Sequence, residues 1–160
     1  MYKPTVLLGV CLIFLTSCFN DDNPEITEYS FYENATIVTT MMDGYGFATI
    51  ESGQSLVFEY FFTASEEPQV ADDEYEERII FEIDATAESF SMSGDDLTMA
   101  NTVFDKYCFC DIRGSIPISS GTISGEKISD NSWNIEIDVT FTDYNEESRN
   151  ISGSFKLTNL

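Results

Sequence analysis

The segment from Trp133 to Phe141 reads WNIEIDVTF, with an apolar residue at every second position. Side chains of a β-strand point alternately to the two faces of a sheet, so this pattern predicts a strand with one buried and one solvated face. The gaps between the apolar residues predict the solvated face: Asn134, Glu136, Asp138 and Thr140.

The same two-residue period recurs along the chain, in Leu56–Thr63, Arg78–Thr86 and Ile151–Leu157. Asp43-Gly44 is a hairpin-turn signal between two further strand-like runs. After Cys18 no long segment shows a convincing helical period. About nine or ten strands at a spacing of roughly 8–12 residues predict an all-β domain, a single antiparallel β-sandwich or small β-barrel.

The composition narrows the possible functions. The chain has 29 acidic and 7 basic residues, a net charge of −22 and no histidine, yet it has 13 Phe and 8 Tyr. Such aromatic content predicts a folded domain rather than a disordered acidic segment. The charge argues against nucleic-acid binding and favours cationic partners or divalent ions. Without histidine, the common catalytic triads and histidine metal sites are excluded, so we expect no enzyme and no resident cofactor.

The N-terminal residues predict export. One lysine precedes the apolar run Val6–Leu15, which is the pattern of a secretory signal peptide. This run is shorter than the roughly 20 apolar residues that a membrane-spanning helix needs. It is followed by Leu15-Thr16-Ser17-Cys18 and then by Phe19–Asn23, which is polar and acidic after the phenylalanine.

Leu15–Cys18 resembles the lipobox of bacterial lipoproteins, which implies a diacylglycerol and an N-acyl chain on Cys18. Two or more acyl chains anchor a protein stably in a membrane. The division expected is a cleaved signal peptide over 1–17, a lipidated cysteine with acidic tether over 18–28, and an all-β domain over 29–160. The tether resembles the export signal of Bacteroidota surface lipoproteins, so we expect attachment to the outer membrane, with surface display favoured over a periplasmic location.

The C-terminal run from Ser120 to Leu157 resembles the closing hairpins of small calycin-like or β-sandwich lipoproteins of Bacteroidota. It combines a Gly-Thr strand, an Asn turn, an alternating strand and a Gly-Ser strand. This likeness supports the all-β fold and implies nothing more specific.

Two cysteines follow the anchor, Cys108 and Cys110, in the sequence YCFCD. On a regular strand they share a face, with Cα atoms near the upper separation limit for a disulfide. Burial as two thiols is favoured, while a disulfide and a soft-metal site remain alternatives.

An acidic loop from Ala64 to Glu77 offers oxygen ligands, and its candidate metal ligands are Asp72, Asp73, Glu74 and Glu76. Calcium loops place their ligands at alternate positions around a glycine, which this loop lacks. A solvated loop is therefore favoured, with a calcium site or a cationic-partner contact as the alternative.

The alternation in Leu56–Thr63 puts several aromatic residues on one face. Filling a core is the usual role of such a face, but these residues could instead line a cavity. The candidate ligand-lining residues are Phe58, Tyr60, Phe62 and Trp133. Two functions are candidates: a lipid-anchored binding or surface protein with a cationic protein as its candidate partner, or a calycin-like binder of a small apolar ligand.

Overall fold

The computed structural model describes residues 24–65, 73–109, 114–143 and 145–160, and it confirms the all-β class. The elements are β1 (Ile26–Met42), β2 (Tyr45–Ser52), β3 (Ser55–Thr63), β4 (Tyr75–Asp84), β5 (Ser89–Ser93), α1 (Asp95–Met99), β6 (Val103–Cys108), β7 (Ile116–Pro117), β8 (Ser120–Ser129), β9 (Ser132–Thr142) and β10 (Glu146–Leu157). Within these ranges no helix is long and apolar enough to cross a bilayer.

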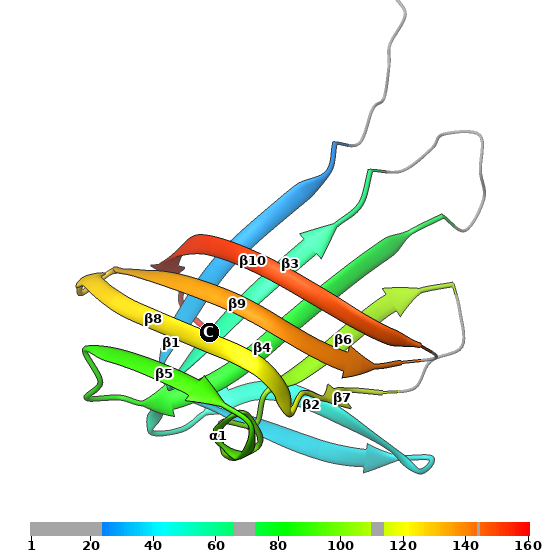
Figure 1. The fold of residues 1–160 in the computed structure, drawn as a ribbon, viewed down its shortest axis with the longest axis horizontal. Helices are drawn as coiled ribbons and strands as arrows, with labels where there is room; N and C mark the ends of the chain where they lie inside the picture. Colours follow the sequence, from blue (N-terminus) through cyan, green and yellow to red (C-terminus); the bar gives the residue numbers. More distant parts are fainter. Residues whose placement is uncertain (1–23, 66–72, 110–113, 144) are drawn as a thin grey trace, which may run out of the picture.

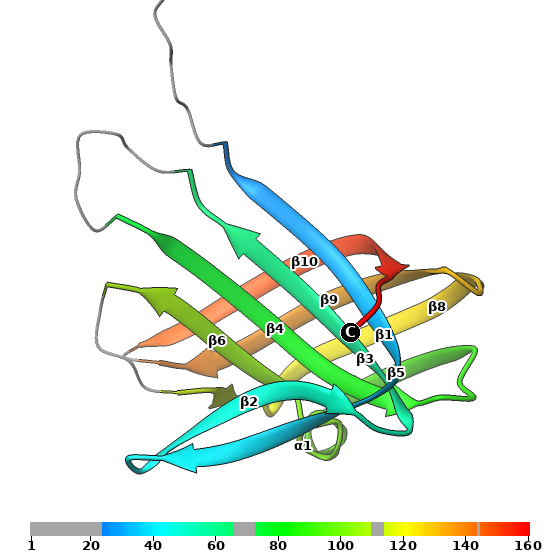
Figure 2. The same cartoon turned by 180° about the vertical axis from the view of Figure 1, so that it is seen from behind.

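The strands belong to one sheet, in the order β5-β8-β9-β10-β1-β3-β4-β6-β7, with β2 paired to β1 outside this path. The sheet curls into a half-barrel (Figures 1 and 2). Neighbouring strands are antiparallel except β1 and β10, which pair in parallel through Ser30 with Lys156 and Phe31 with Leu157. The expected antiparallel sheet is therefore mixed where the first and last strands meet.

The alternation of β9 is borne out. Its apolar residues are buried, and of the intervening residues Asn134, Glu136 and Asp138 are exposed while Thr140 is half-buried. On the same face of the neighbouring strands lie other buried side chains, including Ile123 of β8 and Phe155 of β10. The inner face of the half-barrel thus forms the main core.

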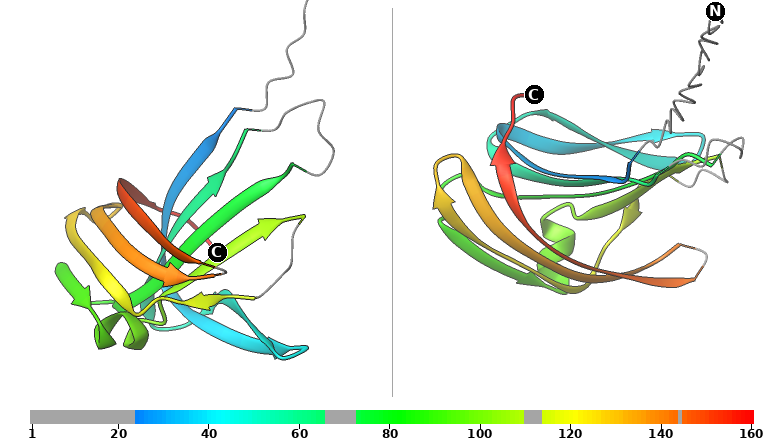
Figure 3. Two further views of the ribbon diagram at one scale, coloured as in Figure 1. Left: turned by 45° about the vertical axis from the view of Figure 1, so that its right-hand side comes forward. Right: turned by 90° about the horizontal axis from the view of Figure 1, so that it is seen from above.

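Aromatic rings fill the middle of this core. The ring of Phe58 in β3 lies 5.2–6.0 Å, between centroids, from the rings of Phe31, Phe81, Phe90, Trp133 and Phe155. These partners come from both sides of the half-barrel, which face each other in Figure 3. The short helix α1 lies between the two sides at one end, where its Leu97 is fully buried.

A second, smaller core lies on the outer face of β3, β4 and β6. Val57 and Ile80 point outward from the main core, and both are fully buried because the β1–β2 hairpin covers them. The hairpin contributes Ala35, Ile37 and Ala48 to this layer. β3 and β4 are apolar on both faces, so burial on one side alone would leave large side chains in water.

Strand β1 is one continuous element of 17 residues with an irregularity in its middle. Its pairing with β3 shifts register between Tyr32 and Ala35, and Asn34 in between adopts a φ of 53°. Asn tolerates this left-handed conformation better than most residues. The irregularity lets the first half of β1 pair with β3 and the second half with β2.

The contact between β1 and β10 requires a glycine. A Cβ atom on Gly153 of β10 would lie 2.4 Å from the ring of Tyr29 in β1. The Tyr29 ring in turn packs against Phe155 and Tyr60, with centroids 5.2 and 5.8 Å away. The Tyr29 ring thereby packs between β1 and β10, which pair through few residues.

Candidate functional site

The residues expected to line a ligand cavity lie in the main core. Phe58, Tyr60 and Trp133 are buried there, and Phe62 packs partly buried against them. The rings of Phe58, Tyr60 and Trp133 each lie within 6.0 Å, between centroids, of another aromatic ring of the interior. These side chains therefore fill the interior of the half-barrel.

The candidate metal ligands are spread along one segment. Asp72 lies outside the described residues, Asp73 and Glu74 precede β4, and Glu76 lies within it. Among the described residues no group of three or more Asp, Glu, Cys or His side chains is placed to hold a metal ion. The calcium alternative thus gains no support from the described geometry.

The cysteines are placed only in part. Cys108 ends β6, is half-buried and is disulfide-bonded, whereas Cys110 and Cys18 lie outside the described residues. For Cys108 the structure differs from the favoured expectation of a buried thiol. It corresponds to the alternative in which the sulfur is oxidised.

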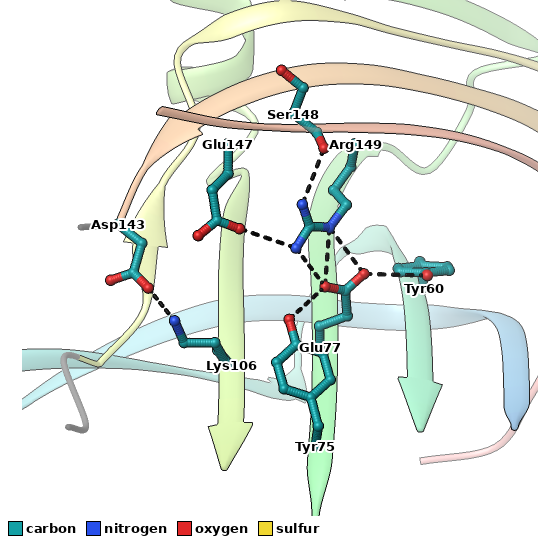
Figure 4. A network of polar contacts seen from close by, with 8 residues as sticks. All are labelled: Tyr60, Tyr75, Glu77, Lys106, Asp143, Glu147, Ser148 and Arg149. Carbon is teal, nitrogen blue, oxygen red and sulfur yellow. Dashed lines mark hydrogen bonds and ion pairs between the residues drawn. The ribbon is translucent and has the colours of Figure 1, made fainter. Parts of the chain in front are cut away.

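A polar network that the sequence did not predict lies at one end of the half-barrel. Glu77 of β4 points to the inner face and is only 5% exposed. Its carboxylate accepts hydrogen bonds from Nε and Nη2 of Arg149 in β10, at 3.0 and 2.8 Å to Oε2 (Figure 4). The Tyr75 hydroxyl donates at 3.0 Å and the Tyr60 hydroxyl at 3.4 Å.

A second ion pair lies beside the first. Lys106 of β6 pairs with Asp143, the residue after β9. Phe104 and Phe141 stack with centroids 4.1 Å apart, and the Arg149 guanidinium lies 5.4 and 5.6 Å from these rings. These contacts join β4 and β6 to β9 and β10 across the interior, since β1 and β3 separate them in the sheet order.

The protonation states suit a structural role for this network. Burial and the adjacent Glu77 carboxylate raise the pKa of Tyr60 and of Tyr75, so both phenols stay neutral donors. Burial opposes the charge of Arg149, but its hydrogen bonds to Glu77 outweigh this and raise its pKa. The Glu77 carboxylate is thus surrounded by the hydrogen-bond donors Tyr60, Tyr75 and Arg149.

Polar contacts also fix the hairpin to the outer face. Arg78 of β4 donates from Nε and Nη2 to Asp105, at 2.9 and 2.6 Å, and from Nη2 to the carbonyl of Ala48, at 2.8 Å. Glu82 accepts from the backbone N–H of Ile37 at 3.0 Å. The hairpin is therefore held by its backbone as well as by the small core beneath it.

The cations of the described residues are largely neutralised. Arg78, Lys106, Lys127 and Arg149 each form an ion pair with a carboxylate, and Lys156 donates to the Ser132 hydroxyl. Many other described carboxylates face solvent, among them Asp43, Glu51, Asp95, Asp96, Glu126, Glu136 and Asp138. The surface carries the excess negative charge of the chain.

An apolar recess of about 340 Å³ lies between the hairpin and β6. Phe47 and Ala48 of β2 form one wall, and Tyr107 and Cys108 of β6 form another, with Gly114 and Ser115 beside them. The hairpin tip next to it exposes Met41, Met42 and Tyr45. Sequence reasoning missed this surface, although MMDGYGF places apolar residues on both sides of a turn where polar ones are usual.

Comparisons of the chain with protein-family models, with curated proteins and with solved structures find no match.

Proposed function

We propose that this protein is a non-catalytic lipoprotein of the cell envelope whose acidic surface engages a cationic protein. Cys18 carries the acyl anchor, and the chain attaches to the outer membrane with its domain displayed on the surface. The anchor rests on the sequence pattern at Leu15–Cys18, because these residues lie outside the described part of the chain.

One observation supports the choice of partner above the others. The ion pairs of the described residues use most of their Lys and Arg side chains, and exposed carboxylates remain in excess. A surface of one sign raises the association rate of an oppositely charged protein and disfavours binding between copies of itself. A basic protein is the partner that this surface suits.

The absence of histidine supports the non-catalytic role, since the usual general base near neutral pH is missing from the whole chain. The buried carboxylate of Glu77 is occupied by hydrogen bonds from Tyr60, Tyr75 and Arg149. A small apolar ligand would need space among the core rings, which instead contact one another.

Lysozyme provides a basic probe for this proposal. The full chain, purified in a mild detergent, should bind lysozyme saturably at about 0.15 M salt, and binding should weaken as salt is raised because screening shortens the reach of charge. Succinylated lysozyme, with its lysines turned into carboxylates, is the matched control. Equal retention of both forms, or binding to neither, would refute the cationic-partner proposal.

A further inference from the structure

The hairpin-tip surface is an exposed apolar area on a strongly acidic molecule. It comprises the hairpin tip, where Met42 and Tyr45 share one face and Met41 lies on the other, together with Phe47 and Tyr107 at the adjoining recess. Met41, Met42 and Tyr45 are 68, 60 and 47% exposed. Clustered exposed apolar side chains of this kind mark interaction sites far more often than single ones do.

Folding does not explain these side chains. The core beneath the hairpin uses Ala35, Ile37 and Ala48, which lie nearer the base of the hairpin than the tip residues do. Methionine is flexible and polarisable, and tyrosine combines a large apolar ring with a hydroxyl, so both adapt well to a partner surface.

The walls of the recess are preformed. The N–H of Ser115 donates to the carbonyl of Gly46 at 2.7 Å, and the N–H of Ala48 donates to the Ser115 hydroxyl, also at 2.7 Å. The Arg78 guanidinium holds the Ala48 carbonyl from the other side. Because these contacts occupy polar groups of β2, the strand presents its side chains rather than a free backbone edge near the recess.

Among the described residues, the charges at this surface are negative or neutralised. Asp43 lies in the hairpin turn and Glu51 near the end of β2, and both are exposed. Of the charged residues that line the recess, Asp105 is paired with Arg78 and Lys106 with Asp143. A partner that brings cations to the rim therefore meets carboxylates, whereas an acidic partner or a second copy of this chain meets like charge.

The position of the tip suits contact away from the anchor. β1 begins near the upper edge of the molecule in Figures 1 and 2, and the tip of the β1–β2 hairpin lies at the lower edge. If the chain is tethered through the residues before β1, the hairpin tip points away from the membrane that holds it.

We propose that the hairpin-tip surface is the docking site for a basic protein that inserts an apolar side chain, flanked by Lys or Arg, into the recess beside Phe47 and Tyr107. This inference rests on the proposed function and adds the place and chemistry of the contact. The apolar centre excludes water while the rim supplies the complementary charge, which is the usual arrangement of a binding hot spot.

The test uses the full chain in detergent and two synthetic peptides. One has a central Trp between Lys residues, and the other has Glu in place of each Lys. The Lys peptide should bind and protect the backbone amides of β2 and β6 from hydrogen exchange. The double variant Met41→Ser with Met42→Ser should weaken this binding at least about tenfold, because hot-spot side chains carry most of an interface's free energy.

Matched controls are Met99→Ser and Ile128→Ser, which remove exposed apolar side chains elsewhere on the surface. The inference is overturned if one of the control variants weakens peptide binding as much as the tip variant does. It is also overturned if the Lys and Glu peptides bind equally well, or if neither peptide binds. Neutral phosphatidylcholine vesicles form a further arm: if the tip variant loses vesicle binding but not peptide binding, the surface contacts lipid and the inference fails. If lysozyme still binds in these cases, only the docking site is refuted and the proposed function stands.

Discussion

Glu77 and Arg149 are 72 residues apart in the chain, yet Nη2 of Arg149 lies 2.8 Å from Oε2 of Glu77 inside the half-barrel. The two strands that carry them, β4 and β10, are not neighbours in the sheet. The ion pair thus fixes how far the sheet curls at this end. At the other end the parallel pairing of β1 with β10 and the Tyr29 ring hold the two halves together.

Removing one partner of this pair should be costly. Glu77→Ala leaves the Arg149 guanidinium partly buried without its main acceptor, and breaking a buried pair costs roughly 3–5 kcal/mol of unfolding free energy. The double variant Glu77→Met with Arg149→Met should recover much of this loss. The urea midpoints of the wild type, the single variant and the double variant measure this loss of stability, and the exposed Glu136→Ala serves as control. A loss in Glu77→Ala no larger than in the control would show that the pair does not hold the sheet.

The stability should fall at alkaline pH. Burial and the Glu77 carboxylate raise the pKa of Tyr60 and Tyr75 above the ordinary tyrosine value of 10.0, so folding favours their protonated forms. This stabilisation is complete below about pH 10, where the phenols of the unfolded chain are also protonated, and is lost as pH rises towards the folded-state pKa. Urea midpoints measured from pH 8 to 11 should therefore decline above about pH 10.

The variant Tyr60→Phe with Tyr75→Phe should show a shallower alkaline decline, and the exposed Tyr45→Phe serves as control. Tyr32 and Tyr107 also have raised pKa values, through burial first and through neighbouring carboxylates second, so part of the decline should persist. An unchanged slope in the double variant would contradict the assignment to Tyr60 and Tyr75.

The sequence predicted the elements whose pattern is local. The strict alternation of β9 could place each side chain because one face is apolar and the other polar along its whole length. In β3 and β4 the second face also carries apolar residues, such as Val57 and Ile80, and the two-residue period predicted neither their burial nor the segment that covers them.

The long-range relationships could not be predicted. With 29 acidic residues, the sequence gives no reason to pair Arg149 with Glu77 rather than with a nearer carboxylate. The parallel contact of β1 with β10 depends on Tyr29 meeting Gly153, and neither residue is unusual by itself. Helix α1 spans five residues, which is too short to show a helical period.

The proposed anchor is tested at Cys18. Metabolic labelling with a fatty-acid analogue should label the wild-type chain, whereas Cys18→Ala should be unlabelled and recovered as an unprocessed or soluble form, because the acylated thiol is missing. Cys108→Ala is the matched control, since it removes another cysteine and should keep the label. Labelling of Cys18→Ala at the wild-type level would refute lipidation at this residue.

The side chains of β9 point alternately to the main core and to solvent. Ile137 is 1% exposed and packs in the main core, whereas its neighbour Glu136 faces solvent. Ile137→Ala loses transfer free energy and leaves a cavity, and should cost roughly 2–5 kcal/mol of unfolding free energy. Glu136→Ala should change it by no more than about 0.5 kcal/mol. The residues are adjacent, so the contrast tests orientation rather than region.

The urea midpoints of Ile137→Ala and Glu136→Ala show which face of β9 is buried. A small domain has only about 5–15 kcal/mol of stability in total, so the loss in Ile137→Ala should shift the midpoint clearly. The slopes should stay alike, because the surface exposed on unfolding hardly changes. Equal losses in the two variants would mean that both faces of β9 are buried, and a larger loss in Glu136→Ala would mean that the strand is shifted by one residue in register, since such a shift exchanges the two faces.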